Sequence, residues 1–332
     1  MSNHKKEKMN LYPLKFQPIF KYRIWGGHKL RTVLEKEFDG DQIGESWEIS
    51  NVQGDETFIL EGPLQGQTLK QIINTYKGDI VGEKVYQSFG NSFPLLIKFI
   101  DANLPLSIQV HPDDEKAKSR HQSFGKNEMW YIMDADADAE IIVGFKEETQ
   151  PNEYLKKLEA GNLIELLNVE KVRKEDVYYI PAGRVHAIGA GVLLAEIQQT
   201  SDITYRIFDY NRIDATTGKE RTLHNDLAID VIDFNAYPSY KTTFNKNENE
   251  SNKLVHSPFF TSNFLRITAN TLKDYSSVDS FVIYICVNGE LEIQVDTVNY
   301  SLRKGETILF PAFITKVNII VTDVADVVEV YL

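Results

Sequence analysis

An internal repeat constrains the fold of this chain more than any other feature. The segment Gly305–Ala312, Gly-Glu-Thr-Ile-Leu-Phe-Pro-Ala, aligns with Glu175–Ala182, Glu-Asp-Val-Tyr-Tyr-Ile-Pro-Ala. In both copies a short apolar strand ends in a Pro-Ala turn. Self-similarity of this kind indicates that one structural unit occurs twice, so we predict a duplicated β-barrel. In this alignment Lys316 stands opposite His186, and the second copy therefore lacks the imidazole.

The arrangement of strands and polar segments predicts where the two units begin and end. Residues 245–252, Asn-Lys-Asn-Glu-Asn-Glu-Ser-Asn, contain no apolar side chain and are flanked by patterned sequence. Beyond them short strands recur at a spacing of roughly 8–12 residues, which is typical of sandwiches and barrels. We predict a flexible tail over residues 1–10, a first domain over 11–244, a linker over 245–252 and a second domain over 253–332.

A few helices are predicted around the strands. Apolar spacing predicts a helix over residues 68–76, which Thr68 can cap. The sequence Pro-Asp-Asp-Glu at 112–115 starts another helix, with its acidic residues in the first turn. Further helical patterns cover residues 151–169 and the region near 223–234. The predicted fold class is mainly β, with peripheral helices.

Two strands in the middle of the first unit carry polar residues in unusual places. The segment 94–100 is strongly apolar except for Lys98, and its neighbours favour an inward-facing lysine. An Asp-Ala-Asn turn leads from it to Leu106–His111, so we expect these two strands to form a hairpin. In the second strand the period of two places Gln109 and His111 on one face and apolar side chains on the other.

A candidate metal site follows from these two polar residues and two others. Glu128 starts a predicted strand, and His186 follows the turn Pro-Ala-Gly at 181–183. Two imidazoles, a carboxylate and an amide oxygen suit zinc, and also Mn, Fe or Co. From the residues alone two other interpretations stay open. Gln109 and His111 can belong to a solvated strand face, and Glu128 can form an ion pair with Lys126 or Arg184.

Charge and cysteine content bear on partners and compartment. The formal net charge of −12 argues against nucleic acid or an anionic membrane as partner, because both need a basic surface. A single cysteine, Cys286, excludes an internal disulfide, which suits a reducing cytoplasm. No apolar run approaches the 18 or so residues of a membrane span, and residues 1–10 lack the apolar stretch of a signal peptide.

The motifs resemble those of two nested families. The pattern Gln109-Val-His111-Pro, with Glu128 downstream and Pro-Ala-Gly-x-x-His186, resembles the metal-binding pattern of the cupin superfamily. More narrowly, the chain is similar to type I mannose-6-phosphate isomerases of the short bacterial form. The matching segments are Pro105–Asp113, Ser201-Asp-x-x-Tyr-Arg206, Trp25-Gly-Gly27 and Gly44–Ser50. The resemblance covers roughly residues 11–332 and is strongest from 94 to 212.

This resemblance implies two cupin-type β-barrels, or jelly rolls, and a zinc-dependent aldose–ketose isomerase. The implied reaction interconverts mannose 6-phosphate and fructose 6-phosphate through a cis-enediol. The implied cofactor is one zinc ion per chain, held in the first barrel only; its implied ligands are Gln109, His111, Glu128 and His186. The chain lacks most of the helical insertion that longer members carry between the barrels.

Other residues receive roles from the resemblance and from their place in the pattern. Arg206 lies where the family has its essential arginine, and we expect it to stabilise the enediolate. Glu196 shares a strand face with Gln198 leading toward Arg206, and is the first candidate for the general base. Asp202 is the second. The alternative role for each carboxylate is an ion pair that holds Arg206 in place.

The remaining predictions concern substrate binding and competing functions. Lys126, Arg184 and Lys98 are candidates for binding the substrate phosphate. One alternative function is an Fe or Mn cupin oxygenase, which would leave these cations without an anion to bind. Another is a non-catalytic sugar-phosphate-binding or regulatory protein with a structural metal. The sequence leaves open whether the chain is a monomer or a homodimer.

Overall fold

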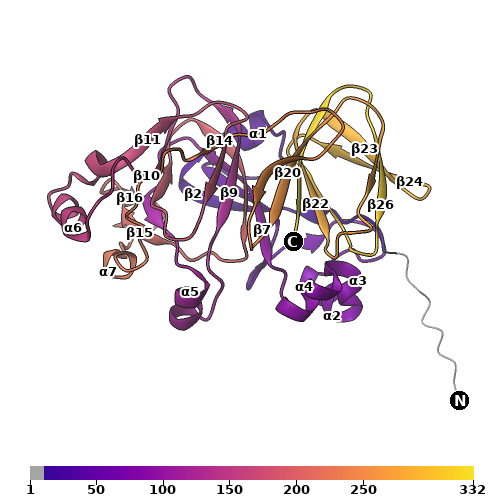
Figure 1. The fold of residues 1–332 in the computed structure, drawn as a ribbon, viewed down its shortest axis with the longest axis horizontal. Coiled ribbons are helices and arrows are strands. Elements are labelled where there is room, and N and C mark those ends of the chain that lie inside the picture. Colours follow the sequence, from indigo (N-terminus) through magenta and orange to yellow (C-terminus); the bar gives the residue numbers. More distant parts are fainter. Residues whose placement is uncertain (1–10) are drawn as a thin grey trace, which may run out of the picture.

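The computed structural model describes residues 11–332 (Figure 1). The molecule is organised around strands that are buried on both faces. The predicted tail, residues 1–10, lies outside the described residues. Two sheets make up the first unit. The seven-stranded sheet has the order β18 (Lys241–Thr242), β12 (Val177–Ile180), β9 (Glu128–Ala135), β14 (Val192–Gln199), β7 (Leu95–Ala102), β2 (Ile19–Gly27), β3 (Ile43–Ile49). The five-stranded sheet has the order β11 (Leu167–Lys171), β10 (Glu140–Phe145), β13 (His186–Ile188), β8 (Ile108–Val110), β15 (Tyr205–Phe208).

Two further sheets form the second unit, and short hairpins and helices surround both. One sheet has the order β19 (Asn252–His256), β20 (Thr261–Ile267), β27 (Ala325–Tyr331), β22 (Val282–Asn288), β25 (Thr307–Phe310). The other has the order β21 (Thr271–Asp274), β26 (Lys316–Ile320), β23 (Glu290–Val295), β24 (Val298–Arg303). The short pairs are β1 (Phe16–Gln17) with β6 (Phe58–Ile59), β4 (Asn51–Val52) with β5 (Asp55–Glu56), and β16 (Ile213–Asp214) with β17 (Lys219–Glu220). The helices are α1 (Lys29–Thr32), α2 (Leu69–Tyr76), α3 (Gly78–Val81), α4 (Glu83–Phe89), α5 (Asp114–His121), α6 (Pro151–Glu159) and α7 (Asn225–Ala228).

The first unit contains two apolar core clusters and the second contains one, and a fourth joins the units. Strands β7, β9 and β14 turn one set of side chains, including Ile100 and Trp130, into the first unit. Their opposite faces, including Phe99, pack against the sheet of the second unit and against α2–α4. Figure 1 shows these three helices beneath the second unit, far along the chain from it. Burial on both faces explains why the predicted strand 94–100 is apolar throughout apart from Lys98.

The mainly β architecture of two jelly rolls with peripheral helices is confirmed. The repeat is visible in it, because a strand, a Pro-Ala turn and a second strand recur as β12–β13 and β25–β26. Lys316 begins β26 as His186 begins β13. The structure does not test the proposed domain boundaries, which stay a prediction. None of the described helices is long and apolar enough to cross a membrane.

The predicted hairpin between the two central strands is wrong. β7 pairs with β14 and β3 in the seven-stranded sheet, whereas β8 pairs with β13 and β15 in the other sheet. The chain crosses between the sheets after β7, and the Leu106 N–H donates to the Ile188 carbonyl at 2.8 Å. Short apolar strands have several eligible partners, and long-range packing selects among them.

Two predicted helices are shorter in the structure. The pattern over 151–169 becomes α6, a 3-10 turn over Leu163–Leu166 and then β11. Gly161, with a φ of 73°, marks the end of α6 because this left-handed conformation favours glycine. Near 223–234 only α7 is α-helical. By contrast, α2 starts at the predicted cap, since the Thr68 side chain accepts from the Gln71 N–H.

We expect the two units to unfold as one because of the core that joins them. Phe264 on β20 is fully buried, and its ring stacks on Tyr131 of β9 at a centroid distance of 6.2 Å. Phe264→Ala should lower the free energy of unfolding by about 3–5 kcal/mol. In the control Leu272→Ala, which removes a side chain that is 61% exposed, the loss should stay within about 0.5 kcal/mol.

Urea unfolding followed by tryptophan fluorescence measures this coupling, because all three tryptophans lie in the first unit. A lower midpoint for Phe264→Ala means that a residue of the second unit stabilises the first. An unchanged fluorescence midpoint would contradict the shared core.

Candidate metal centre and active site

Four side chains predicted as metal ligands gather at one end of the first unit. Gln109 lies in β8 directly opposite His186 of β13, and Glu128 begins β9. His111 follows the end of β8. Ligand atoms of His111, Glu128 and His186 all lie within 4.8 Å of one another, and these three side chains are buried. The cluster therefore joins residues from three strand regions, of which the strand period predicted only that Gln109 and His111 share a face.

Backbone carbonyl groups fix the orientation of both imidazoles. The Nδ1–H of His111 donates to the Ile203 carbonyl, and that of His186 to the Arg184 carbonyl, each at 2.8 Å. Both Nε2 atoms then carry a lone pair toward Glu128, at 3.6 Å from its Oε2 and 3.4 Å from its Oε1 respectively. Hydrogen bonds of this kind are typical of metal-binding histidines.

Burial sets the protonation states of these groups. It lowers the pKa of His111 well below the usual value, and the Lys126 ammonium lowers it further. Burial also lowers the pKa of His186, to about 3. Both imidazoles are therefore neutral near pH 7, the form that binds a metal. Burial raises the pKa of Glu128 because it outweighs the neighbouring Lys126.

The donor set fits a divalent cation. Glu128 Oε1 is buried and has no hydrogen-bond partner among residues 11–332, which leaves a carboxylate oxygen free to coordinate. The Gln109 side-chain N–H donates to His186 Nε2 at 3.2 Å, so this amide lies beside the ligand atoms. Two neutral imidazoles and a carboxylate match the ligand types of zinc.

Glu128 forms an ion pair with Lys126 but not with Arg184, the other predicted partner. The Lys126 ammonium contacts Glu128 Oε2 and lies 3.1 Å from His111 Nε2. Arg184 points elsewhere: its guanidinium lies over the rings of Tyr237 and Tyr240, at 4.6 and 5.0 Å from their centroids. An ion pair with Lys126 uses one carboxylate oxygen, so it is compatible with coordination through the other.

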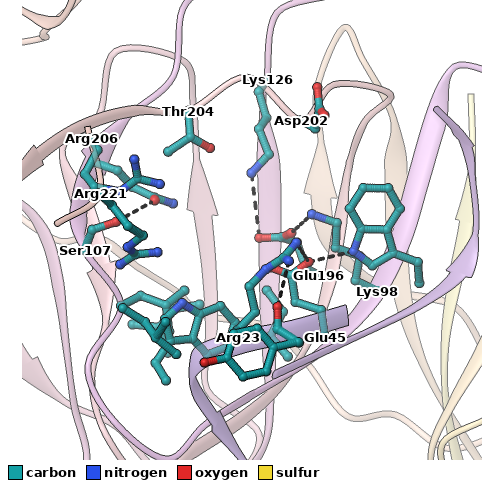
Figure 2. Close-up of a pocket in the computed structure, with 18 of the residues that line it drawn as sticks. Arg23, Glu45, Lys98, Ser107, Lys126, Glu196, Asp202, Thr204, Arg206 and Arg221 are labelled. Atoms are coloured by element: carbon teal, nitrogen blue, oxygen red, sulfur yellow. Dashed lines mark hydrogen bonds and ion pairs between the residues drawn. The ribbon is translucent and has the colours of Figure 1, made fainter. Parts of the chain in front are cut away.

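A pocket of about 410 Å³ opens beside this cluster (Figure 2). Pockets of this size hold small organic ligands. Most of the catalytic and substrate-binding residues predicted from the sequence line it: Lys98, Lys126, Glu196, Asp202 and Arg206, together with the ligand candidate Gln109. Arg184 is absent from the lining because it packs on tyrosines outside the pocket. The structure thus gives no support to Arg184 as a group that binds substrate here.

Glu196 is one of two buried carboxylates that line this pocket, the other being Glu45. Its oxygens lie 3.3 Å from Lys98 Nζ and 4.0 Å from Lys126 Nζ, and Trp130 Nε1 donates to it at 3.0 Å. Its ion partners are therefore lysines and not Arg206, which speaks against the alternative role. Burial alone would raise the pKa of Glu196, but the two ammonium groups outweigh burial and hold it below the usual value. The second candidate base, Asp202, is exposed.

Several lining residues were not predicted as functional. Arg23 Nη2 forms an ion pair with Glu45 at 3.0 Å, and this arginine and Lys98 lower the pKa of Glu45 to about 2, against the effect of burial. Glu45 belongs to the motif Gly44–Ser50, which is the signal that could have marked it. Arg221 stands in no motif and comes from the segment after β17. Only the folded chain brings it to the pocket.

The second unit does not reproduce the ligand set. In each unit the last strand residue before the Pro-Ala turn, Ile180 or Phe310, pairs with one residue of the neighbouring strand in its sheet. That residue is Glu128 in the first unit and Val282 in the second. Lys316 takes the place of His186, and its register partner is Asp274 where His186 faces Gln109. Valine and lysine are not among the usual ligands of zinc, so the prediction of a single site in the first unit is kept.

Comparisons with known proteins agree on one family. Residues 13–150 match the family described as phosphomannose isomerase type I, catalytic domain, and residues 250–322 match the mannose-6-phosphate isomerase cupin domain. The chain is 35% identical over 307 residues to mannose-6-phosphate isomerase ManA of Bacillus subtilis, covering 91% of this chain and 94% of that protein. It is 34% identical to mannose-6-phosphate isomerase of Streptococcus mutans, covering 90% and 92%.

Structural comparison gives the same result over nearly the whole chain. The crystal structure of mannose 6-phosphate isomerase from Bacillus subtilis superposes with a TM-score of 0.87 at 29% identity, covering 96% of this chain and 99% of that one. A putative mannosephosphate isomerase from Archaeoglobus fulgidus shares the fold with a TM-score of 0.77 at 22% identity, covering 98% and 99%.

Proposed function

The chain belongs to the type I mannose-6-phosphate isomerase family, and from this premise we propose that it interconverts D-mannose 6-phosphate and D-fructose 6-phosphate with one bound zinc ion. The observation that carries the proposal is the position of Glu196. A buried carboxylate with a low pKa faces the same pocket as Arg206 and lies next to the ligand cluster. Proton abstraction from a sugar carbon needs an ionised base near groups that stabilise the resulting oxyanion, and the lowered pKa of Glu196 keeps it ionised.

The proposed zinc ligands are His111, Glu128, His186 and Gln109. A bound zinc ion supplies Lewis acidity toward oxygen atoms of the sugar. Lys126 keeps contact with Glu128 and so borders both the ligand cluster and the pocket. The proposed stoichiometry of one ion per chain follows from a single ligand set among the described residues.

The chain's own residues account for the proton transfer. Glu196 Oε2, which is buried without a hydrogen-bond partner in the described region, takes the proton from C2 of mannose 6-phosphate. Arg206 donates hydrogen bonds to the oxyanion of the cis-enediolate, whose charge it offsets. Protonated Glu196 then returns the proton to C1, and the proton of the C2 hydroxyl passes to the C1 oxygen, which gives the ketose. Lys98 and Lys126 hold Glu196 in its ionised form and are also the proposed donors to substrate oxygen atoms.

A conversion assay with mannose 6-phosphate tests the proposal. Nuclear magnetic resonance in deuterated water should show mannose 6-phosphate converting to fructose 6-phosphate, with deuterium entering at the carbon that is reprotonated. Binding of mannose 6-phosphate without conversion would instead indicate a non-catalytic binding protein. Oxygen consumption with an iron- or manganese-loaded protein would indicate an oxygenase.

The proposed compartment is the cytoplasm. The only cysteine, Cys286, is buried in the second unit, and burial raises its pKa to about 12, so the thiol is unreactive near neutral pH. A free thiol of this kind is compatible with a reducing environment. Fractionation of cells that express the protein tests this assignment.

A further inference from the structure

The pocket has a second end, away from the proposed base Glu196. Figure 2 shows Arg206, Arg221 and Ser107 on one side of it, apart from Glu196 and Lys98 on the other. Arg221 comes from the segment that follows the β16–β17 hairpin, outside both sheets of the first unit. It therefore reaches the pocket from an element that contributes nothing to the ligand cluster.

A buried carboxylate holds Arg221 in place. Arg221 donates to Asp209 through Nε at 2.8 Å and through Nη2 at 2.5 Å, a two-point contact that fixes the plane of the guanidinium. Asp209 is 5% exposed and also accepts from Arg212 Nη2 at 2.5 Å. Arg212 in turn donates to the Pro105 carbonyl at 2.5 Å, which ties this network to the segment before β8. The Nη1 group of Arg221 makes no hydrogen bond to the described residues.

Positive charge exceeds negative charge at this end. Two guanidinium groups, of Arg212 and Arg221, share the one buried carboxylate of Asp209, and Arg206 adds a third positive charge at this end. Asp214, an acid that lines the pocket, accepts the Thr216 N–H. Arg206 uses Nη1 to bind the Thr222 carbonyl at 2.9 Å, but its Nε is buried with no hydrogen-bond partner in residues 11–332. Burial and the charge of Arg221 both lower the pKa of Arg206.

The cations at the other end are already neutralised. Arg23 is paired with Glu45, Lys98 with Glu196, and Lys126 with Glu128. An anionic group of a ligand would have to displace a carboxylate there, whereas the arginine end has unpaired donors. Guanidinium groups also match the oxygen geometry of a phosphate through two-point contacts.

We propose that Arg221 binds the phosphate group of the substrate, and that Asp209 is a positioning residue for Arg221. This inference rests on the proposed function in that it takes the substrate to be a sugar phosphate. It replaces Arg184 in the predicted phosphate site and leaves Lys98 and Lys126 to the sugar. The phosphate would lie at the end of the pocket opposite Glu196, which directs the reacting carbons toward the base.

Phosphate affinity tests the assignment without relying on turnover. Isothermal titration calorimetry with inorganic phosphate should give a Kd that is higher by about 10–100-fold in Arg221→Gln than in the unsubstituted protein, as expected for loss of a charged hydrogen bond. The matched control is Arg212→Gln, which removes the same charge from the same carboxylate but outside the pocket lining. Its Kd should stay within about threefold of the unsubstituted value.

A double variant tests the positioning role of Asp209. Asp209→Asn should weaken phosphate binding less than Arg221→Gln does. The combination of both should be no weaker than Arg221→Gln alone, because the carboxylate acts through that arginine. Additive losses would show that Asp209 acts independently and would overturn its assigned role.

The outcomes separate this inference from the proposed function. An unchanged Kd in Arg221→Gln, an equal loss in Arg212→Gln or no phosphate binding by the unsubstituted protein would each overturn the inference. If Arg221→Gln weakens phosphate binding but the unsubstituted protein does not isomerise mannose 6-phosphate, the phosphate site stands and the proposed reaction fails. If the unsubstituted protein isomerises mannose 6-phosphate but Arg221→Gln binds phosphate with an unchanged Kd, the proposed reaction stands and the phosphate site fails.

Discussion

The His111→Ala variant is expected to lose its bound metal and its turnover while remaining folded. The removed imidazole is buried, and its Nε2 is one of the ligand atoms that lie within 4.8 Å of one another. Losing a group that only hydrogen-bonds a ligand typically costs 10–100-fold in metal affinity. We expect a larger loss here, since a ligand itself is deleted.

The fold should survive this change because apolar side chains on the other face of β8 form the core. Ile108 and Val110 are fully buried there, and they do not depend on the imidazole. The control is His121→Ala. It removes an imidazole that is not part of the ligand cluster and whose Nε2 lies 2.8 Å from the Tyr205 hydroxyl. Circular dichroism, elemental analysis and an isomerase assay give the three readouts. Full turnover in metal-depleted His111→Ala would contradict the proposed metal centre.

The Glu196→Gln variant is expected to bind metal and substrate but to lose about 10²–10⁴-fold in kcat, the usual contribution of a general base. Glutamine keeps nearly the same volume and can still accept from Trp130 Nε1. It cannot take a proton from C2. The variant also leaves Lys98 and Lys126 without their shared carboxylate, so a moderate change in KM is expected as well.

The matched comparison for Glu196→Gln is Asp202→Asn, which changes the second candidate base. Asp202 lines the same pocket but is exposed. Single-turnover measurements and solvent deuterium incorporation should place the large loss in Glu196→Gln and a small one in Asp202→Asn. The reverse order would assign the base to Asp202 and leave Glu196 as a structural partner of the lysines.

Local sequence signals account for how the candidate ligands are brought together, while their role as metal ligands stays a prediction. The period of two in β8 put Gln109 and His111 on one face, and the Pro-Ala-Gly turn put His186 at the start of a strand. Helix starts with clear caps were also correct, as for α5, where the Asp113 side chain accepts from the Lys116 N–H. These features depend on neighbouring residues, so the sequence carries them directly.

Long-range choices could not be predicted in the same way. The partner of β7 depends on which apolar faces meet across the two units, which no local pattern records. Arg184 and Arg221 show the same limit, because both are arginines in turn-rich segments. Aromatic rings outside the pocket hold Arg184, whereas Asp209 directs Arg221 into the pocket. Only the tertiary contacts distinguish them.

Metal content measured together with turnover tests the central claim most directly. Elemental analysis of the purified protein, and conversion of mannose 6-phosphate before chelation, after chelation and after zinc is restored, give all the values needed. We predict about one zinc ion per chain, since the described residues contain one ligand set, and turnover that is lost and regained with it. Turnover that persists undiminished after the metal has been removed would contradict the account.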